Sequence, residues 1–169
     1  MTQRVELATV MDRLGIDEMI TEYAVAVDDG DWEAYRGLFT ADGRADYRSA
    51  GGIEGDARQV AAWLAQNMRL FPMRQHLIVN RRVRFGVREQ DIGDTAQVQA
   101  DYVNPMRFAG SEGGPNGGSD SGSGEPDFVC GGRYAFAFAR TYDGWRLREV
   151  VVQEKWRRMQ PAREGNAAP

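Results

Sequence analysis

The chain is poor in the residues that mark disulfide-rich and metal-dependent proteins. Its 169 residues include a single cysteine, Cys130, and a single histidine, His76. One cysteine cannot form a disulfide within the chain, and it cannot supply a zinc site of the usual four-ligand type. No neighbouring feature marks Cys130 as a nucleophile, so we interpret it as a small residue of a strand. With one cysteine and one histidine, the sequence predicts a protein without a metal site.

The chain also lacks a strong charge of one sign and a long apolar run. Its 21 basic and 25 acidic residues give a formal net charge of −4. A modest acidic excess gives no electrostatic footprint for nucleic acid. No apolar run approaches the ~18 residues of a membrane span, and the first residues do not form the apolar stretch of a signal peptide. We expect a cytoplasmic protein with neither nucleic acid nor membrane as partner.

Length and composition indicate one domain with one core over residues 1–160. Residues 110–126 are dominated by Gly, Ser, Pro, Asn and Asp, so they bury little apolar area and are expected to form a flexible loop between two strands. They lack the Lys-Ser/Thr ending of a phosphate-binding loop, and no helix follows them. Residues 161–169 are expected to be a disordered tail.

Three helices are predicted in the first half of the chain. The longest covers residues 12–29, with Asp12 as its N-cap and Gly30 just after its end. Its apolar residues recur at helical spacing: Ile16, Met19, Ile20, Tyr23 and Val27. Two shorter helices are predicted over residues 32–39 and 57–68, each beginning after an aspartate that can cap it.

A short strand is predicted over 44–49, before the third helix. From Pro72 onward the apolar pattern changes to period two, which is typical of strands, and longer strands are predicted over 75–87, 95–108, 127–142 and 145–156. Helices followed by antiparallel strands predict an α+β fold with the helices on one face of a curved sheet. One face of the strand pairs, with Tyr134, Phe136 and Phe138, would expose large aromatics in a monomer, so we expect a homo-oligomer.

His76 is the only side chain whose unperturbed pKa lies near neutrality. Period two places it with Ile78, opposite Leu77 and Val79. From position alone, a structural histidine and a catalytic one both remain open. Asp28 borders the apolar stripe near the end of the first helix, where the helix dipole disfavours an anion. It is either an ordinary surface residue or a buried charge with a partner.

Two tyrosines have the same ambiguity. Tyr23 lies on the apolar stripe of the first helix, five residues before Asp28, and Tyr47 lies on the first strand. Each is either a core aromatic with its hydroxyl at the surface or a hydroxyl donor inside a pocket.

A family resemblance bears on these choices. Over residues 10–158 the chain resembles the SnoaL-like branch of the nuclear-transport-factor-2-like superfamily. Its motifs are the segment YAVAVDDGDW at 23–32, the strand Asp46-Tyr47-Arg48-Ser49, the pair Gln75-His76 with Asn80, and the turn Tyr142-Asp143-Gly144-Trp145. The resemblance implies a cone-shaped α+β barrel, in which three N-terminal helices pack on a curved antiparallel sheet around a pocket.

Within that superfamily the chain is similar to scytalone dehydratase, the bile-acid dehydratases and hexachlorocyclohexane dehydrochlorinase. These enzymes use an Asp at the end of the first helix and a His after the third, positions that Asp28 and His76 fill here. Tyr23 matches a tyrosine of the bile-acid enzymes, and Tyr47 matches a tyrosine of the short strand. The second histidine of scytalone dehydratase is replaced by Met106.

The resemblance implies a cofactor-independent dehydratase, a lyase that removes water next to a carbonyl of a hydrophobic cyclic substrate. His76 would be the base, Asp28 would orient it, and Tyr23 and Tyr47 would donate hydrogen bonds. The expected apolar walls of the pocket are Trp63, Met68, Phe71, Met106 and Trp156. A pocket asparagine of scytalone dehydratase falls at Ala135, and the general base of ketosteroid isomerases falls at Tyr47.

Two other functions remain open. A polyketide cyclase or isomerase would use the same cone with acid–base residues elsewhere. A non-catalytic small-molecule binding module would leave Asp28 far from His76, or would fill the cavity. The similar dehydratases tend to be trimers and other branches of the superfamily dimers, so both assemblies remain open.

Overall fold

The structure, a computed structural model, describes residues 2–110 and 126–159. All but the two ends of the predicted 110–126 loop, and the whole predicted 161–169 tail, lie outside the described residues. The elements, in chain order, are α1 (Thr2–Asp29), α2 (Trp32–Gly37), β1 (Phe39–Asp46), η1 (Arg48–Ala50), β2 (Glu54–Asp56), α3 (Ala57–Asn67), η2 (Met68–Leu70), β3 (Met73–Arg74), β4 (Leu77–Phe85), β5 (Thr95–Arg107), β6 (Phe128–Thr141) and β7 (Gly144–Met159).

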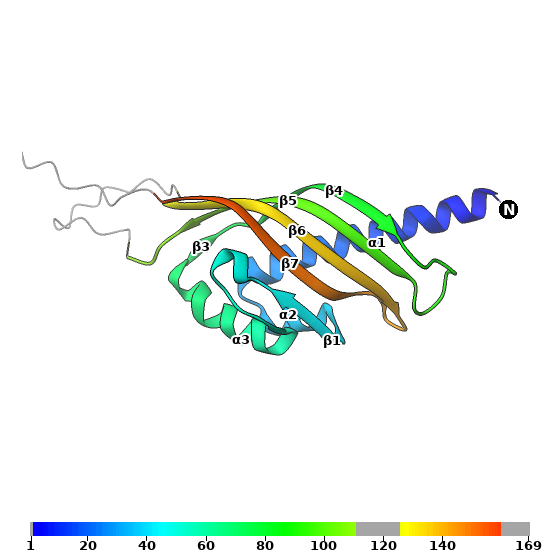
Figure 1. Cartoon of the computed structure of the whole chain (residues 1–169), viewed down its shortest axis with the longest axis horizontal. Helices are drawn as coiled ribbons and strands as arrows, with labels where there is room; N and C mark the ends of the chain where they lie inside the picture. The colour runs from blue at the N-terminus through cyan, green and yellow to red at the C-terminus, as the bar shows by residue number, and fades with distance from the viewer. Residues whose placement is uncertain (1, 111–125, 160–169) are drawn as a thin grey trace, which may run out of the picture.

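The strands form one curved sheet in the order β2-β1-β7-β6-β5-β3, with β4 also paired to β5. Figure 1 shows α1 running along one face of the long strands, with α2 and α3 beside β1. The predicted α+β cone is confirmed, but the sheet is mixed because β1 pairs with β7 in parallel. A period-two pattern states that a segment is a strand and leaves open the direction of its distant neighbour.

The helix α1 begins at Thr2, well before the predicted start at Asp12. Asp12 is therefore not an N-cap. Its carboxylate is buried inside the fold and accepts hydrogen bonds from Arg140 Nη2 at 2.7 Å and Trp145 Nε1 at 3.2 Å. A carboxylate that finds buried donors on β6 and β7 does not compete for the backbone N–H groups of its own helix, so the helix continues through it.

The two other predicted caps are confirmed. The Asp31 side chain accepts a hydrogen bond from the Ala34 N–H at the start of α2. Asp56 and Gln59 form a reciprocal capping box at the start of α3. These caps satisfy backbone donors that an isolated helix end would leave unpaired. They fix where α2 and α3 begin, and α3 goes on to form one wall of the cavity described below.

The strand boundaries differ from prediction near the site. The strand predicted over 44–49 runs from Phe39 to Asp46 as β1, with a register break between Phe39 and Arg44. Tyr47, predicted on this strand, lies just after it at the start of η1. The strand β4 begins at Leu77, so His76 lies in the link just before it. The ladder between β4 and β5 shifts register after Val79, where Asn80 has a φ of +53°. The strand predicted over 75–87 is thus β4, with a bulge after Val79.

Tyr134, Phe136 and Phe138 face the helices and are buried. Tyr134 and Phe136 both make edge contacts with the ring of Tyr23 on α1, at 5.6 and 5.5 Å between ring centroids. The prediction that this face exposes aromatics is wrong, because these rings form the core under α1. The homo-oligomer stays a prediction without that support.

No helix among the described residues is long and apolar enough to cross a membrane.

Candidate functional site

Asp28 and His76 meet at the end of α1. His76 Nδ1 donates to Asp28 Oδ1 at 2.6 Å, and the His76 backbone N–H donates to both carboxylate oxygens, at 3.1 Å to Oδ1 and 2.9 Å to Oδ2. The last turn of α1 is an electrostatically poor place for an anion, and these donors compensate for it. The carboxylate thus holds both the ring and the backbone of His76.

This contact fixes the tautomer of the imidazole. A neutral ring that donates from Nδ1 to a carboxylate carries its lone pair on Nε2. Among the described residues, Nε2 has no hydrogen-bond partner, and His76 lines a cavity that is partly open to solvent. The ring therefore presents a proton acceptor to that cavity while its other nitrogen is held in place.

The cavity has a volume of about 330 Å³ and lies between α3, η2 and the inner faces of β5, β6 and β7. This volume falls at the small end of the usual range for small-molecule sites. Its walls are mostly apolar: besides predicted residues they include Val27, Leu64, Leu70, Tyr102, Phe108, Phe128, Val152 and Met159. Such walls favour a hydrophobic ligand and raise the strength of electrostatic contacts inside.

Four of the five predicted wall residues line this cavity: Trp63, Met68, Phe71 and Met106. The fifth, Trp156, does not. It is half-exposed and its ring covers Gly131, where a Cβ atom would lie 2.4 Å from the ring. The pairing of β6 with β7 shifts register between Gly131 and Gly132, which turns Arg157 toward the cavity and Trp156 away.

The predicted tyrosines lie in a cluster of buried hydroxyls. Tyr47 lines the cavity, and its hydroxyl is hydrogen-bonded to that of Tyr23, which lies behind it. The Tyr35 hydroxyl lies 3.5 Å from that of Tyr47. Burial raises the pKa of both Tyr23 and Tyr47 well above the ordinary value. Both hydroxyls therefore keep their protons near neutral pH and can donate hydrogen bonds.

Sequence reasoning missed several polar groups of the cavity wall. Asn104 and Tyr134 both line it, and the nearness of Asn104 lowers the Tyr134 pKa, which burial as the larger effect raises. Period two could have found Asn104, because it shares a strand face with Met106. Ala135, where the resemblance placed an asparagine, does not line the cavity, because it lies on the opposite face of β6 from Tyr134.

Glu154 and Cys130 also line the cavity. Arg157 Nε donates to Glu154 Oε1 at 2.6 Å, so these opposite charges are paired at the wall. Burial raises the pKa of the Cys130 thiol to about 12, which keeps it protonated. The bulge in β7 hides Arg157 from a strict period-two pattern, whereas Glu154 shares a strand face with Val152 and could have been found.

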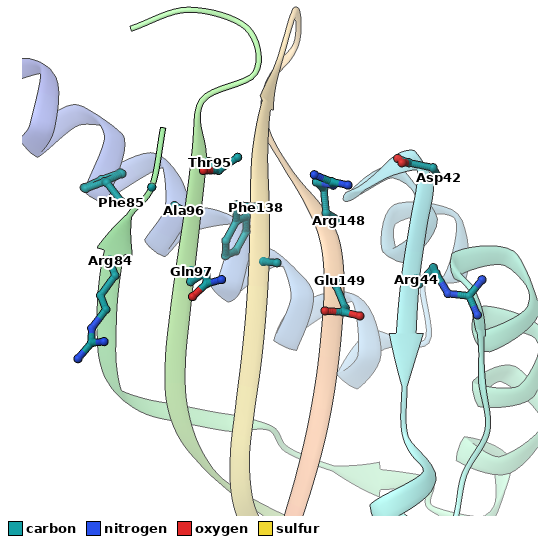
Figure 2. Close-up of a pocket in the computed structure, with 12 residues that line it drawn as sticks. Asp42, Arg44, Arg84, Phe85, Thr95, Ala96, Gln97, Phe138, Arg148 and Glu149 are labelled. Carbon is teal, nitrogen blue, oxygen red and sulfur yellow. The ribbon is translucent and has the colours of Figure 1, made fainter. Parts of the chain in front are cut away.

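A larger hollow of about 660 Å³ lies elsewhere, beside β1, β4, β5, β6 and β7. Figure 2 shows Arg84 on β4, Gln97 on β5 and Glu149 on β7 around this hollow, with α1 behind the sheet. It contains neither Asp28 nor His76, and several of its charged side chains are exposed. We place the candidate site in the smaller cavity, because His76, paired with Asp28, lines it together with mostly apolar residues.

Among residues 2–110 and 126–159, no three His, Cys, Asp or Glu side chains gather in a way that could hold a metal ion.

Comparison with known proteins gives one family and several relatives. The family model of the SnoaL-like domain matches residues 8–151. The uncharacterized protein Rv2910c of Mycobacterium tuberculosis is 32% identical over 153 residues, which cover 90% of this chain and 92% of that protein.

Two solved structures are similar in fold. A scytalone dehydratase-like protein from Novosphingobium aromaticivorans has a TM-score of 0.66 at 14% identity, covering 98% of this chain and 100% of its own. A type 3 LinA hexachlorocyclohexane dehydrochlorinase from Novosphingobium barchaimii has a TM-score of 0.68 at 13% identity, covering 97% of this chain and 99% of its own. At such identities the likeness shows the fold alone.

Proposed function

The chain belongs to the SnoaL-like family, and we propose that it is a cofactor-independent dehydratase that removes water next to a carbonyl of a hydrophobic cyclic substrate. The observation that carries the proposal is the Asp28–His76 hydrogen bond of 2.6 Å, made by a histidine that lines an apolar cavity. The elimination enzymes among the proteins of similar fold add support to it.

The first step is the removal of a proton from the carbon next to the carbonyl. Nε2 of His76 takes this proton, and the electron pair of the C–H bond moves toward the carbonyl oxygen as an enolate forms. Asp28 keeps the ring in the required tautomer and stabilises the imidazolium. A well-placed base of this kind contributes about 10²- to 10⁴-fold in rate.

The developing enolate oxygen needs a donor. Tyr47 lines the cavity with a protonated hydroxyl, and Tyr23 holds that hydroxyl from behind. A preorganised donor between apolar walls stabilises the charge more than it would in water. In this proposal Tyr47 contacts the substrate, and Tyr23 acts through Tyr47 as a positioning residue.

The second step expels the leaving hydroxyl. The enolate electrons form the carbon–carbon double bond as the C–O bond breaks, and the imidazolium returns its proton so that water leaves. One imidazole serves as base and then as acid, because Met106 occupies the position where scytalone dehydratase has a second histidine. The predicted alternatives, a cyclase and an isomerase, would share the first step and lose no water.

The experiment uses α-tetralone and its β-hydroxy derivative as probes. The wild type should exchange the α-protons of α-tetralone for deuterium, measured by NMR, and should release water from the β-hydroxy ketone, measured by mass spectrometry. Asp28→Asn and His76→Ala should each fold normally and lose at least about 10²-fold in both rates. Asp29→Asn is the matched control, since Asp29 is exposed beside Asp28.

Exchange by the wild type no faster than in buffer, or near-normal rates in either dyad variant, would overturn the proposed base. Exchange without loss of water would instead assign the protein to the isomerases or cyclases. Binding of α-tetralone without exchange would support the third predicted alternative, a non-catalytic binding module.

A further inference from the structure

Asn104 carries an unpaired acceptor in the wall of the cavity. The residue is only 4% exposed, and its Oδ1 has no hydrogen-bond partner among the described residues. The other buried side-chain atoms that lack a partner there, Asp12 Oδ2 and Arg88 Nε, belong to a charge cluster outside the cavity. Buried polar atoms are paired in the great majority of cases, so this acceptor in a ligand-sized space calls for a donor.

The structure orients the Asn104 amide so that Oδ1 is its buried atom without a partner. Asn104 lies close to Tyr134, whose pKa burial raises while the nearness of Asn104 lowers it by a smaller amount. The amide oxygen is then left for another partner, and that partner must carry an N–H or O–H group.

The strand register places this acceptor beside the proposed base. In the pairing of β3 and β4 with β5, Arg74 lies opposite Met106 and Leu77 lies opposite Val103. The same register sets His76 opposite Asn104, and both residues line the cavity. Side chains opposite each other on neighbouring strands have Cβ atoms about 4.5–5.5 Å apart. The proton acceptor of the ring and the amide oxygen thus reach the same part of the cavity.

We propose that Asn104 is a specificity-determining residue whose Oδ1 accepts a hydrogen bond from a hydroxyl group of the ligand, carried near the carbon that His76 deprotonates. The ligand class is then a hydroxylated, and otherwise apolar, ring. The site is neutral at this point, so a hydroxyl satisfies it while an ether or a second carbonyl leaves two acceptors facing each other. The role of the hydroxyl in catalysis rests on the proposed function, whereas its binding does not.

The test compares α-naphthol with its methyl ether, which has the same ring system and no donor. Isothermal titration calorimetry gives the ratio of their dissociation constants for each protein. Relative to the wild type, Asn104→Leu should reduce the preference for naphthol by about three- to tenfold, the effect of one hydrogen bond. Asn67→Leu is the matched control: Asn67 also lines the cavity, but it is only half-buried and has no buried side-chain atom without a partner among the described residues, so the ratio should stay unchanged.

Asn104→Asp covers the case in which the leucine variant does not fold. It keeps a side-chain oxygen acceptor and should keep the preference for naphthol. A wild type that binds both ligands equally, or neither, overturns the inference, as does an Asn104→Leu protein that keeps the wild-type ratio. The same titration with His76→Ala should still show the preference, so a failure of the proposed base is distinguishable from a failure of this inference.

Discussion

The interior carboxylate of Asp12 offers a sharp test of how α1 is held to the sheet. If Asp12 were an N-cap, its replacement by alanine would cost about 1 kcal/mol. The structure predicts more, because the substitution removes a buried ion pair with Arg140 and leaves the Trp145 indole N–H without its partner. Breaking a buried pair costs about 3–5 kcal/mol.

Arg140 keeps a second partner, since its Nε donates to Asp94 Oδ2 at 3.2 Å. We therefore expect Asp12→Ala to cost about 3 kcal/mol, the lower end of that range. For a chain of this size the melting temperature would fall by roughly 6–12 °C. The cost should persist in about 1 M salt, because salt screens buried pairs weakly.

The assay is urea unfolding followed by far-ultraviolet circular dichroism, with the free energy of unfolding as the measured quantity. Asp17→Ala is the control on the same helix: Asp17 pairs with Arg81 at 3.3 Å but is about half exposed, so its loss should cost no more than about 1 kcal/mol. If Asp12→Ala cost no more than Asp17→Ala, the buried contact would not be what holds this part of α1.

Two further predictions concern acid stability and backbone packing. Burial raises the pKa of Asp94, but hydrogen bonds from the Glu89 and Gln90 N–H groups and from Arg140 lower it below the ordinary value overall. The stability that Asp94 contributes is present above a pH of about 4 and is lost as the pH falls through its folded-state pKa. Asp94→Asn should therefore destabilise the protein near neutrality. Urea unfolding at a series of pH values should also show that the free energy of unfolding of this variant falls less with acidification than that of the wild type. Gly132→Ala places a Cβ 2.2 Å from the Gln153 carbonyl oxygen and should cost about 1–3 kcal/mol by thermal unfolding, whereas Gly37→Ala meets open space and should be neutral or slightly stabilising. An acid transition unchanged in Asp94→Asn, or equal melting temperatures for the two glycine variants, would contradict these assignments.

Local signals predicted the fold well where a residue acts on its own neighbours. The caps Asp31 and Asp56 act within one turn, so the starts of α2 and α3 could be placed from the sequence. Asp12 has the same chemistry, but its partner Arg140 lies 128 residues away. Nothing local distinguishes a cap from a buried ion pair, and the start of α1 was misplaced for that reason.

In the candidate site, too, some features follow from local sequence patterns and others depend on contacts between residues far apart in the sequence. Periodicity left the roles of Asp28 and His76 open, and only the family resemblance paired them; the structure brings them together, while their catalytic role stays a proposal. The period-two pattern could have placed Asn104 in the cavity wall, because it shares a strand face with Met106. The pattern could not predict that Trp156 faces away from the cavity, because the bulge beside Gly131 changes which residues of β7 face inward. Register shifts are set by pairing between strands and leave no trace in the alternation of a single strand.

Asp28 contacts His76 in two ways: its carboxylate orients the imidazole ring, and both of its oxygens accept a hydrogen bond from the His76 backbone N–H. A chain that lost its imidazole would still gain stability from the carboxylate, because any residue at position 76 other than proline offers the same N–H. The structural role of the aspartate therefore does not depend on catalysis. Under the proposed mechanism, the histidine is the position that would separate enzymes from binding proteins in this family, and an aspartate at the end of α1 is not by itself a sign of activity.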